Sequence, residues 1–172
     1  MPNLWRALRL TVLALLLGCL LLLALAEPAM ASVHTYHEQP GQTTYRSRQS
    51  LRDQNDSAWQ ATVFKRYVDG RLQGVYMRLV GFPGRGVVDR QADLSVLTGT
   101  AAQWAAPPSG NLDPGLPENV AQYDVKAILA QMQRPAPLTL VVPLAPTATA
   151  RLVVAPYVVE EWLRIYSADD DL

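Results

Sequence analysis

The chain has 172 residues, a formal net charge of zero, 49% hydrophobic residues and one cysteine, Cys19. A chain without an excess of basic residues lacks the electrostatic footprint of a nucleic-acid-binding protein, so we expect no nucleic-acid partner. A single cysteine excludes an internal disulfide and a cysteine-only metal site. The sequence also contains no zinc, calcium or phosphate-loop motif, and we expect no cofactor.

The first 31 residues have the layout of a cleavable signal peptide. Arg6 and Arg9 precede an unbroken apolar run at residues 10–26, and an Ala-Met-Ala sequence at residues 29–31 forms a small-residue cleavage site. Cleavage there would export a chain with 13 basic and 14 acidic residues and no remaining transmembrane segment. An uncleaved membrane anchor is the alternative, because the run of 17 residues reaches the lower limit of a spanning helix. A lipid-modified Cys19 fits less well, since apolar residues follow it.

Residues 32–166 have the length of one domain, and residues 167–172 form an acidic tail. Residues 42–53 predict a strand. Alternate residues of a strand share a face, so Arg46, Arg48 and Arg52 line one side of it. This row is either a docking surface for a lipid headgroup, a phosphate or an acidic patch, or an exposed face whose arginine stems cover apolar surface. We take these three arginines as candidate binding residues and assign no catalytic residue.

Residues 57–82 predict a β-hairpin that follows this strand. Asp69 and Gly70 form the pair favoured in a two-residue hairpin turn, and a regular ladder from that turn sets Phe64 opposite Val75. One face of the hairpin would then carry Trp59, Val63, Tyr67, Leu72, Tyr76 and Val80. The other face would carry Gln60, Phe64, Arg66, Gln73, Val75, Met77 and Leu79. Neither face is cleanly polar, so we expect part of the second face to be covered as well.

The second half of the chain predicts shorter elements. One or two strands occupy residues 87–99, and the Pro- and Gly-rich residues 105–120 form a long loop that is either functional or loose. Asp124 caps a helix at residues 125–133, with a buried stripe of Val125, Ile128, Leu129 and Met132. Two apolar strands, at residues 137–144 and 150–156, pair with each other.

A last helix begins at Pro156, a residue suited to a first helical turn. It buries Val158, Trp162, Ile165 and Tyr166, and an ion pair between Glu160 and Arg164 lies on the opposite face. We expect Glu160 and its neighbour Glu161 in solvent or against a partner. The predicted fold class is α+β: a mainly antiparallel β-sheet or open barrel with two short helices in the C-terminal half.

The two histidines, His34 and His37, lie at the start of the predicted exported chain, which is a poor scaffold for a catalytic triad. Cleavage after Ala31 would combine the amine of Ser32 with the His34 imidazole, a nitrogen set that suits Cu(II) or Ni(II). A chance histidine near a chain end is the simpler interpretation.

Four sequence stretches resemble an uncharacterised family of exported cyanobacterial proteins, a domain of unknown function. They are "YRSRQSLRDQNDSAWQA", "VYMRLVGFPG", "YDVKAILAQM" and "VVEEWL", in that order, and the resemblance covers most of residues 33–166. The family implies no activity, cofactor or catalytic residue. It does imply a location in the periplasm or the thylakoid lumen.

Two functional hypotheses follow. The first is an exported, non-enzymatic domain that binds a protein or a membrane-associated complex as an accessory or assembly factor, since arginine and aromatic residues recur in interfaces. The alternative is a carrier or weak enzyme that holds a small ligand in a cavity of the β-rich domain, with Trp59, Tyr67 and Tyr76 as its lining. The oligomeric state is not predicted.

Overall fold

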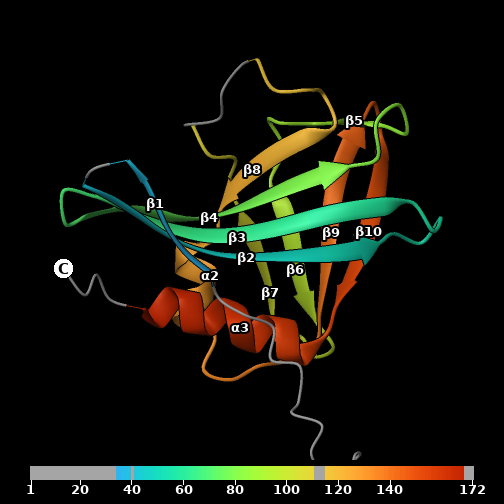
Figure 1. Ribbon diagram of the computed structural model, residues 1–172. Coiled ribbons are helices and arrows are strands. Elements are labelled where there is room, and N and C mark those ends of the chain that lie inside the picture. The colour runs from blue at the N-terminus through green and yellow to red at the C-terminus, as the bar shows by residue number, and fades with distance from the viewer. Residues whose placement is uncertain (1–33, 40, 111–114, 169–172) are drawn as a thin grey trace, which may run out of the picture. The chain divides into compact units, whose positions relative to one another are not determined.

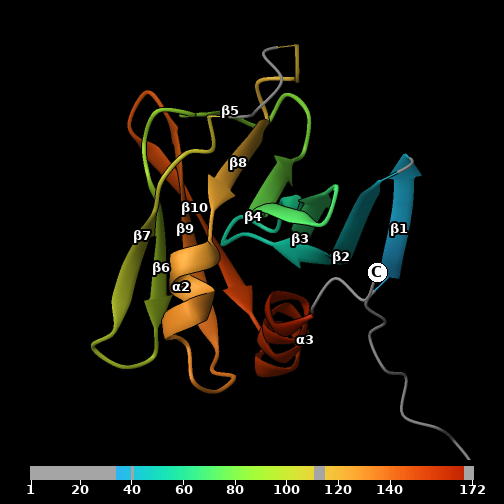
Figure 2. The same cartoon turned by 90° about the vertical axis from the view of Figure 1, so that its left-hand side faces the viewer.

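The computed structural model describes residues 34–39, 41–110 and 115–168. The predicted signal peptide, Ser32 and Val33 of the predicted copper site, and residues 169–172 of the predicted tail lie outside the described residues. The rest folds into two antiparallel sheets and two short helices, which confirms the predicted fold class (Figures 1 and 2). Among the described strands the sheets do not close into a barrel. No helix in the described part of the chain is long and apolar enough to cross a membrane.

Each sheet has a simple antiparallel order. Sheet A has the order β1-β2-β3-β4-β8, with the strands β1 (His34–Gln39), β2 (Gln42–Arg52), β3 (Ala58–Val68), β4 (Arg71–Gly81) and β8 (Val120–Asp124). Sheet B has the order β10-β9-β6-β7, with β5 also paired to β9, and contains β5 (Val87–Val88), β6 (Leu94–Thr98), β7 (Gln103–Ala106), β9 (Leu138–Ala145) and β10 (Ala148–Val154). The predicted meander of three strands and the predicted pair of apolar strands, β9 and β10, are both confirmed.

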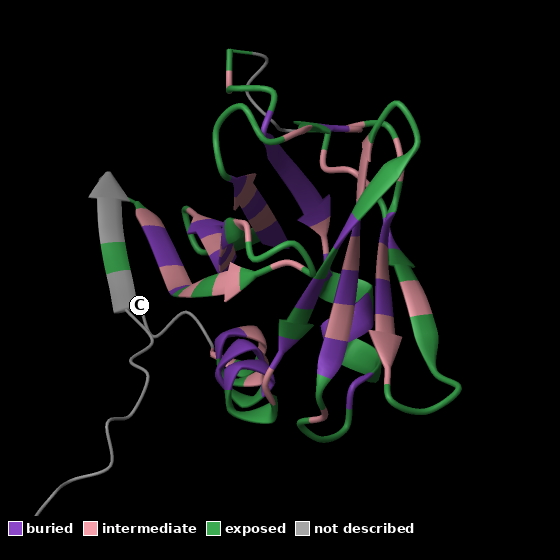
Figure 3. Cartoon of the chain, turned by 90° about the vertical axis from the view of Figure 1, so that its right-hand side faces the viewer, coloured by how far each residue is buried: buried purple, intermediate pink, exposed green. Residues whose placement is uncertain are grey.

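The hydrophobic core lies between the two sheets, and both helices contribute to it (Figures 1 and 2). Alternate positions of β3 and β4 supply the sheet A side, while β6, β9 and β10 supply the sheet B side. Strands of both sheets therefore alternate between buried and more exposed residues (Figure 3). The sheet A members are Trp59, Ala61, Val63, Val75, Met77 and Leu79.

The hairpin of β3 and β4 forms with the predicted turn. Asp69 and Gly70 both have positive φ angles, of 49° and 70°, as a two-residue hairpin turn with a right-handed strand twist requires. Val68 pairs with Arg71 directly beside the turn, as predicted.

The predicted register is wrong beyond that point, because β4 contains a β-bulge. Arg66 pairs with Gly74 while the preceding pair joins Tyr67 to Leu72, so one extra residue, Gln73, is inserted into β4. Phe64 consequently pairs with Tyr76 and not with Val75. A shift of one residue moves every following side chain to the opposite face of the sheet.

The bulge assigns β4 side chains to faces opposite to those predicted. Tyr76 and Val80 leave the Trp59 face and join the outer face of sheet A, whereas three predicted outer residues, Val75, Met77 and Leu79, enter the core. This exchange explains why neither predicted face was cleanly polar. Once the register is shifted, the aliphatic β4 residues and Trp59 lie together in the core.

Gly74 makes the bulge possible. Its φ is +157°, a conformation that residues with a side chain rarely adopt. The Tyr76 ring lies directly over Gly74, and a Cβ atom added there would be 2.5 Å from that ring. The Tyr76 hydroxyl donates a hydrogen bond to the Gln73 carbonyl oxygen at 3.0 Å, which holds the ring in this position.

Helix α2 (Lys126–Gln131) is shorter than the predicted helix, but its buried stripe is confirmed. All four residues of that stripe are buried: Val125, Ile128, Leu129 and Met132. The Asp124 carboxylate accepts a hydrogen bond from the backbone N–H of Lys126 at 2.9 Å, so Asp124 satisfies a free amide at the helix start as predicted.

Helix α3 (Pro156–Ser167) begins at the predicted residue and buries the predicted stripe, with Tyr166 half-buried at its edge. Its ion pair also forms, with 2.8 Å between Arg164 and Glu160. The prediction for Glu161 is wrong: this residue is only 3% exposed and accepts a hydrogen bond from the Gln49 amide of β2 at 2.9 Å. The reason is helical spacing, since Glu161 lies four residues before Ile165 on the buried side of the helix.

Lys65 attaches the end of α3 to sheet A. It points from β3 to the core side, is 5% exposed, and donates hydrogen bonds from Nζ to the carbonyl oxygens of Tyr166 (2.8 Å) and Ala168. A cation at a helix C-terminus satisfies free carbonyl groups and interacts favourably with the helix dipole. The rings of Tyr67 and Tyr166 lie 5.3 and 5.9 Å from the ammonium group.

We predict that Gly74→Ala destabilises the protein by about 1–3 kcal/mol, because a side chain at this φ is strained and the Tyr76 ring must move. Urea unfolding followed by circular dichroism measures the change. Gly99→Ala is the matched control, since Gly99 has no positive φ and a Cβ there meets no atom within 4 Å. Equal unfolding midpoints for the two variants would show that the bulge tolerates a side chain.

We predict that Lys65→Met destabilises the protein by about 1–3 kcal/mol, because the carbonyl groups at the end of α3 lose a charged donor. Lys126→Met is the control, since Lys126 is exposed and is the other lysine of the chain. Amide hydrogen exchange locates the effect, and faster exchange is expected in α3. An unchanged exchange rate in α3 would contradict the attachment.

Candidate functional site

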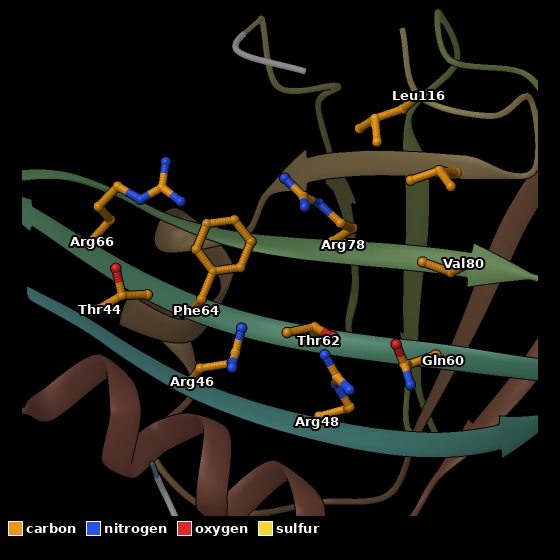
Figure 4. A pocket seen from close by; sticks show the side chains of 11 residues that line it. Thr44, Arg46, Arg48, Gln60, Thr62, Phe64, Arg66, Arg78, Val80 and Leu116 are labelled. Carbon is orange, nitrogen blue, oxygen red and sulfur yellow. The ribbon is translucent and has the colours of Figure 1, made fainter. Parts of the chain in front are cut away.

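The outer face of sheet A, opposite the core, contains a cleft of about 260 Å³ that we call the arginine cleft (Figure 4). Side chains from β2, β3, β4, β8 and the segment before β8 line it. Four of the eleven lining residues are arginines and none is acidic. The lining consists of Thr44, Arg46, Arg48, Gln60, Thr62, Phe64, Arg66, Arg78, Val80, Leu116 and Val120.

Strand register places these side chains in rows across the sheet. One row contains Arg48, Thr62 and Arg78, which are direct neighbours on β2, β3 and β4. Adjacent strands lie about 4.8 Å apart, so the two arginine-bearing strands flank Thr62 at about 10 Å from each other. The next row places Arg46 beside Phe64.

Aromatic rings support three of the four guanidinium groups. Arg66 and Arg78 lie 5.5 and 5.6 Å from the centre of the Phe64 ring, and Arg46 lies 3.9 Å from the centre of the Tyr36 ring on β1. Cations are attracted to ring faces at these distances. Figure 4 shows Phe64 between Arg66 and Arg78, with Arg46 on the neighbouring strand.

Arg78 is held further by a side-chain hydrogen-bond chain. Its Nε and Nη2 atoms both donate to the Gln122 Oε1 atom of β8, at 3.1 and 2.8 Å. Gln122 is buried, and its amide nitrogen donates to the Ser109 hydroxyl at 3.2 Å. These contacts fix the direction of the Arg78 side chain at the middle of the cleft.

The structure brings two of the three sequence-predicted site residues together and separates the third. Arg46 and Arg48 both line the arginine cleft. Arg52 lies at the end of β2, where its guanidinium contacts the Asp56 carboxylate at 3.2 Å and donates to the Asp56 carbonyl oxygen at 2.8 Å. The strand alternation was correct, but the strand extends past the cleft before it reaches Arg52.

Asp53 organises the turn that holds Arg52 away from the cleft. Its carboxylate accepts hydrogen bonds from the backbone amides of Asn55 and Ser57 and from the Trp59 indole. Burial alone would raise the pKa of Asp53, but these hydrogen bonds and the charge of Arg85 outweigh it and lower the pKa below its usual value.

Sequence reasoning missed two of the four arginines of the cleft. Arg66 was placed on the Phe64 face, as observed, but was not considered with the β2 arginines because the pairing of β2 and β3 was not predicted. Arg78 was missed because of the β4 register. The available signal was Gly74, since a glycine inside a strand often marks a bulge.

The predicted loop at residues 105–120 forms one rim of the cleft. Its last residues are held by Arg90, which donates from Nε to the Val120 carbonyl oxygen (2.9 Å) and from Nη2 to those of Leu116 (2.8 Å) and Pro117. The Asn119 side chain adds a hydrogen bond to the Gly81 carbonyl oxygen at 2.6 Å. The part of the loop that carries Leu116 is therefore ordered by contacts with the rest of the domain.

The aromatic residues proposed to line an interior cavity do not lie together. Trp59 and Tyr67 are 7% and 9% exposed on the inner face of sheet A, and Trp59 belongs to the core. Tyr76 lies on the outer face because of the bulge, at 5.6 Å from Phe64. Among the described residues there is also no group of three or more His, Cys, Asp or Glu side chains arranged to hold a metal ion.

Comparison with known proteins identifies a family but no annotated relative. The model of a family described as "Protein of unknown function (DUF3122)" matches residues 31–165. A search of curated proteins and a search of solved structures each found no match.

We predict that Arg90→Ala destabilises the protein by about 1–3 kcal/mol, because several backbone carbonyl groups lose one shared charged donor. Hydrogen exchange should increase at residues 116–120 before other segments respond. Arg134→Ala, at an exposed position after α2, is the control and should leave this segment protected. The same protection pattern in both variants would contradict a role for Arg90 in ordering the rim.

Proposed function

We propose that this chain, which belongs to the DUF3122 family of proteins of unknown function, is a non-enzymatic binding domain that holds an anionic group of a partner in the arginine cleft. The observation that carries this proposal is the lining itself, with four guanidinium groups and no carboxylate among eleven side chains. Guanidinium groups bind carboxylate and phosphate groups through paired hydrogen bonds.

The charge of the cleft is local. The whole chain has equal numbers of basic and acidic residues, so the arginines do not reflect a generally basic protein. Guanidinium groups on neighbouring strands repel one another, and an anion between them removes that repulsion. The supporting rings of Phe64 and Tyr36 and the Gln122 amide orient the arginines without neutralising them.

The lining favours binding over proton transfer. Arginine stays protonated in proteins and is therefore a poor general acid or base. Thr44 and Thr62 supply hydroxyl groups that can donate to an anion, but a threonine nucleophile needs an adjacent base. The cleft thus has the groups that recognise an anion and not the pairs that usually activate one.

We further propose that the domain acts outside the cytoplasm, in the periplasm or the thylakoid lumen, as an accessory or assembly factor of a membrane-associated complex. The support is the order of basic residues, apolar run and small-residue cleavage site in residues 1–31. An acidic or phosphate-bearing group on that complex would occupy the cleft.

We predict that inorganic phosphate binds the cleft and that Arg48→Ala weakens this binding about tenfold, since one charged donor is lost. Arginine Nε–Hε signals in nuclear magnetic resonance spectra report the titration directly. Arg48 is exposed, so the variant should keep its melting temperature. Low ionic strength is required because exposed charges are screened by salt.

Arg52→Ala is the matched control, because Arg52 is an exposed arginine of the same strand that pairs with Asp56 outside the cleft. It should leave phosphate affinity unchanged. Arginine signals that do not shift with phosphate, or equal losses of affinity in the two variants, would contradict the proposed site.

A further inference from the structure

We infer that the arginine cleft recognises an amphipathic anion, a phosphate monoester attached to an apolar chain. This inference rests on the proposed function, because it specifies the ligand of the same cleft. It derives from the chemical division of the cleft, which changes from cationic to apolar over one step along the strands.

The cationic part is centred on Thr62. Arg48 and Arg78 flank Thr62 from the two neighbouring strands, at a strand separation of about 10 Å. A group placed over Thr62 can therefore accept hydrogen bonds from both guanidinium forks and from the hydroxyl. A phosphate monoester suits this arrangement better than a carboxylate, because it has three acceptor oxygens and a charge of about −1.5 to −2 at neutral pH.

The apolar part lies in the adjacent row. Val80 and Val120 are neighbours on β4 and β8, two residues along from Arg78 and Gln122. Two residues of a strand span about 6.8 Å, which a short alkyl chain covers. Leu116 extends over the same end from the rim segment (Figure 4).

The size and order of the cleft fit such a ligand. Its volume of about 260 Å³ is slightly below that of a typical drug-sized pocket, so a headgroup and a few carbon atoms would fill it. Arg90 holds the carbonyl oxygens on either side of the rim segment, at Leu116 and Val120, which fixes the apolar wall relative to the arginines.

The test compares methyl phosphate with hexyl phosphate by isothermal titration calorimetry on the purified protein. Burial of each methylene group should increase affinity about fourfold, so hexyl phosphate is expected to bind at least about tenfold more tightly. Leu116→Ser and Val80→Thr should reduce this preference and leave methyl phosphate affinity unchanged. Arg48→Ala should weaken both ligands by a similar factor, and circular dichroism confirms that each variant is folded.

The outcomes separate the two proposals. Equal affinity for methyl and hexyl phosphate would overturn the amphipathic ligand while the anion-binding function stands. Failure of both compounds to bind would overturn both proposals. A further arm uses phosphatidylcholine vesicles with and without phosphatidic acid: binding only to the vesicles with phosphatidic acid identifies a membrane lipid as the source of the ligand, whereas binding of hexyl phosphate alone identifies a free amphiphile.

Discussion

The β-bulge at Gly74 is the constraint on which both faces of sheet A depend. It shifts the β4 register by one residue, and this shift places the aliphatic side chains of β4 in the core and Arg78 on the outer face. In a regular ladder Arg78 would point into the core, where an unpaired charge is strongly unfavourable. The glycine backbone and the Tyr76 ring packed over it thus determine the core and the arginine cleft together.

Sheet A is a firm base for the cleft because its inner face is attached to other elements by polar as well as apolar contacts. Lys65 binds the end of α3, and Gln49 binds the buried Glu161 of the same helix. Buried polar groups are unfavourable unless they are hydrogen-bonded, so these contacts favour one position of α3. The strands that carry the arginines are therefore held from behind, which favours a preorganised outer surface.

The arginine cleft combines one feature of local sequence with one of tertiary pairing. Arg46 and Arg48 lie on one face because strand side chains alternate, and this was predicted from the sequence. Arg66 and Arg78 join them only through the registers of β2 with β3 and of β3 with β4. Leu116 comes from a loop whose position depends on Arg90, far from it in the sequence, and no local pattern predicts such a contact.

The sequence by itself determined the predominance of antiparallel strands, the Asp69-Gly70 turn, the start of α3 and the buried stripes of both helices. These features follow from turn chemistry and side-chain periodicity, which act over a few residues. The tertiary structure alone decided the β4 register, the burial of Glu161, the exclusion of Arg52 and the full membership of the cleft. The physical reason is that each of these depends on which strand or helix lies opposite, and a one-residue bulge reverses the side on which every following side chain lies.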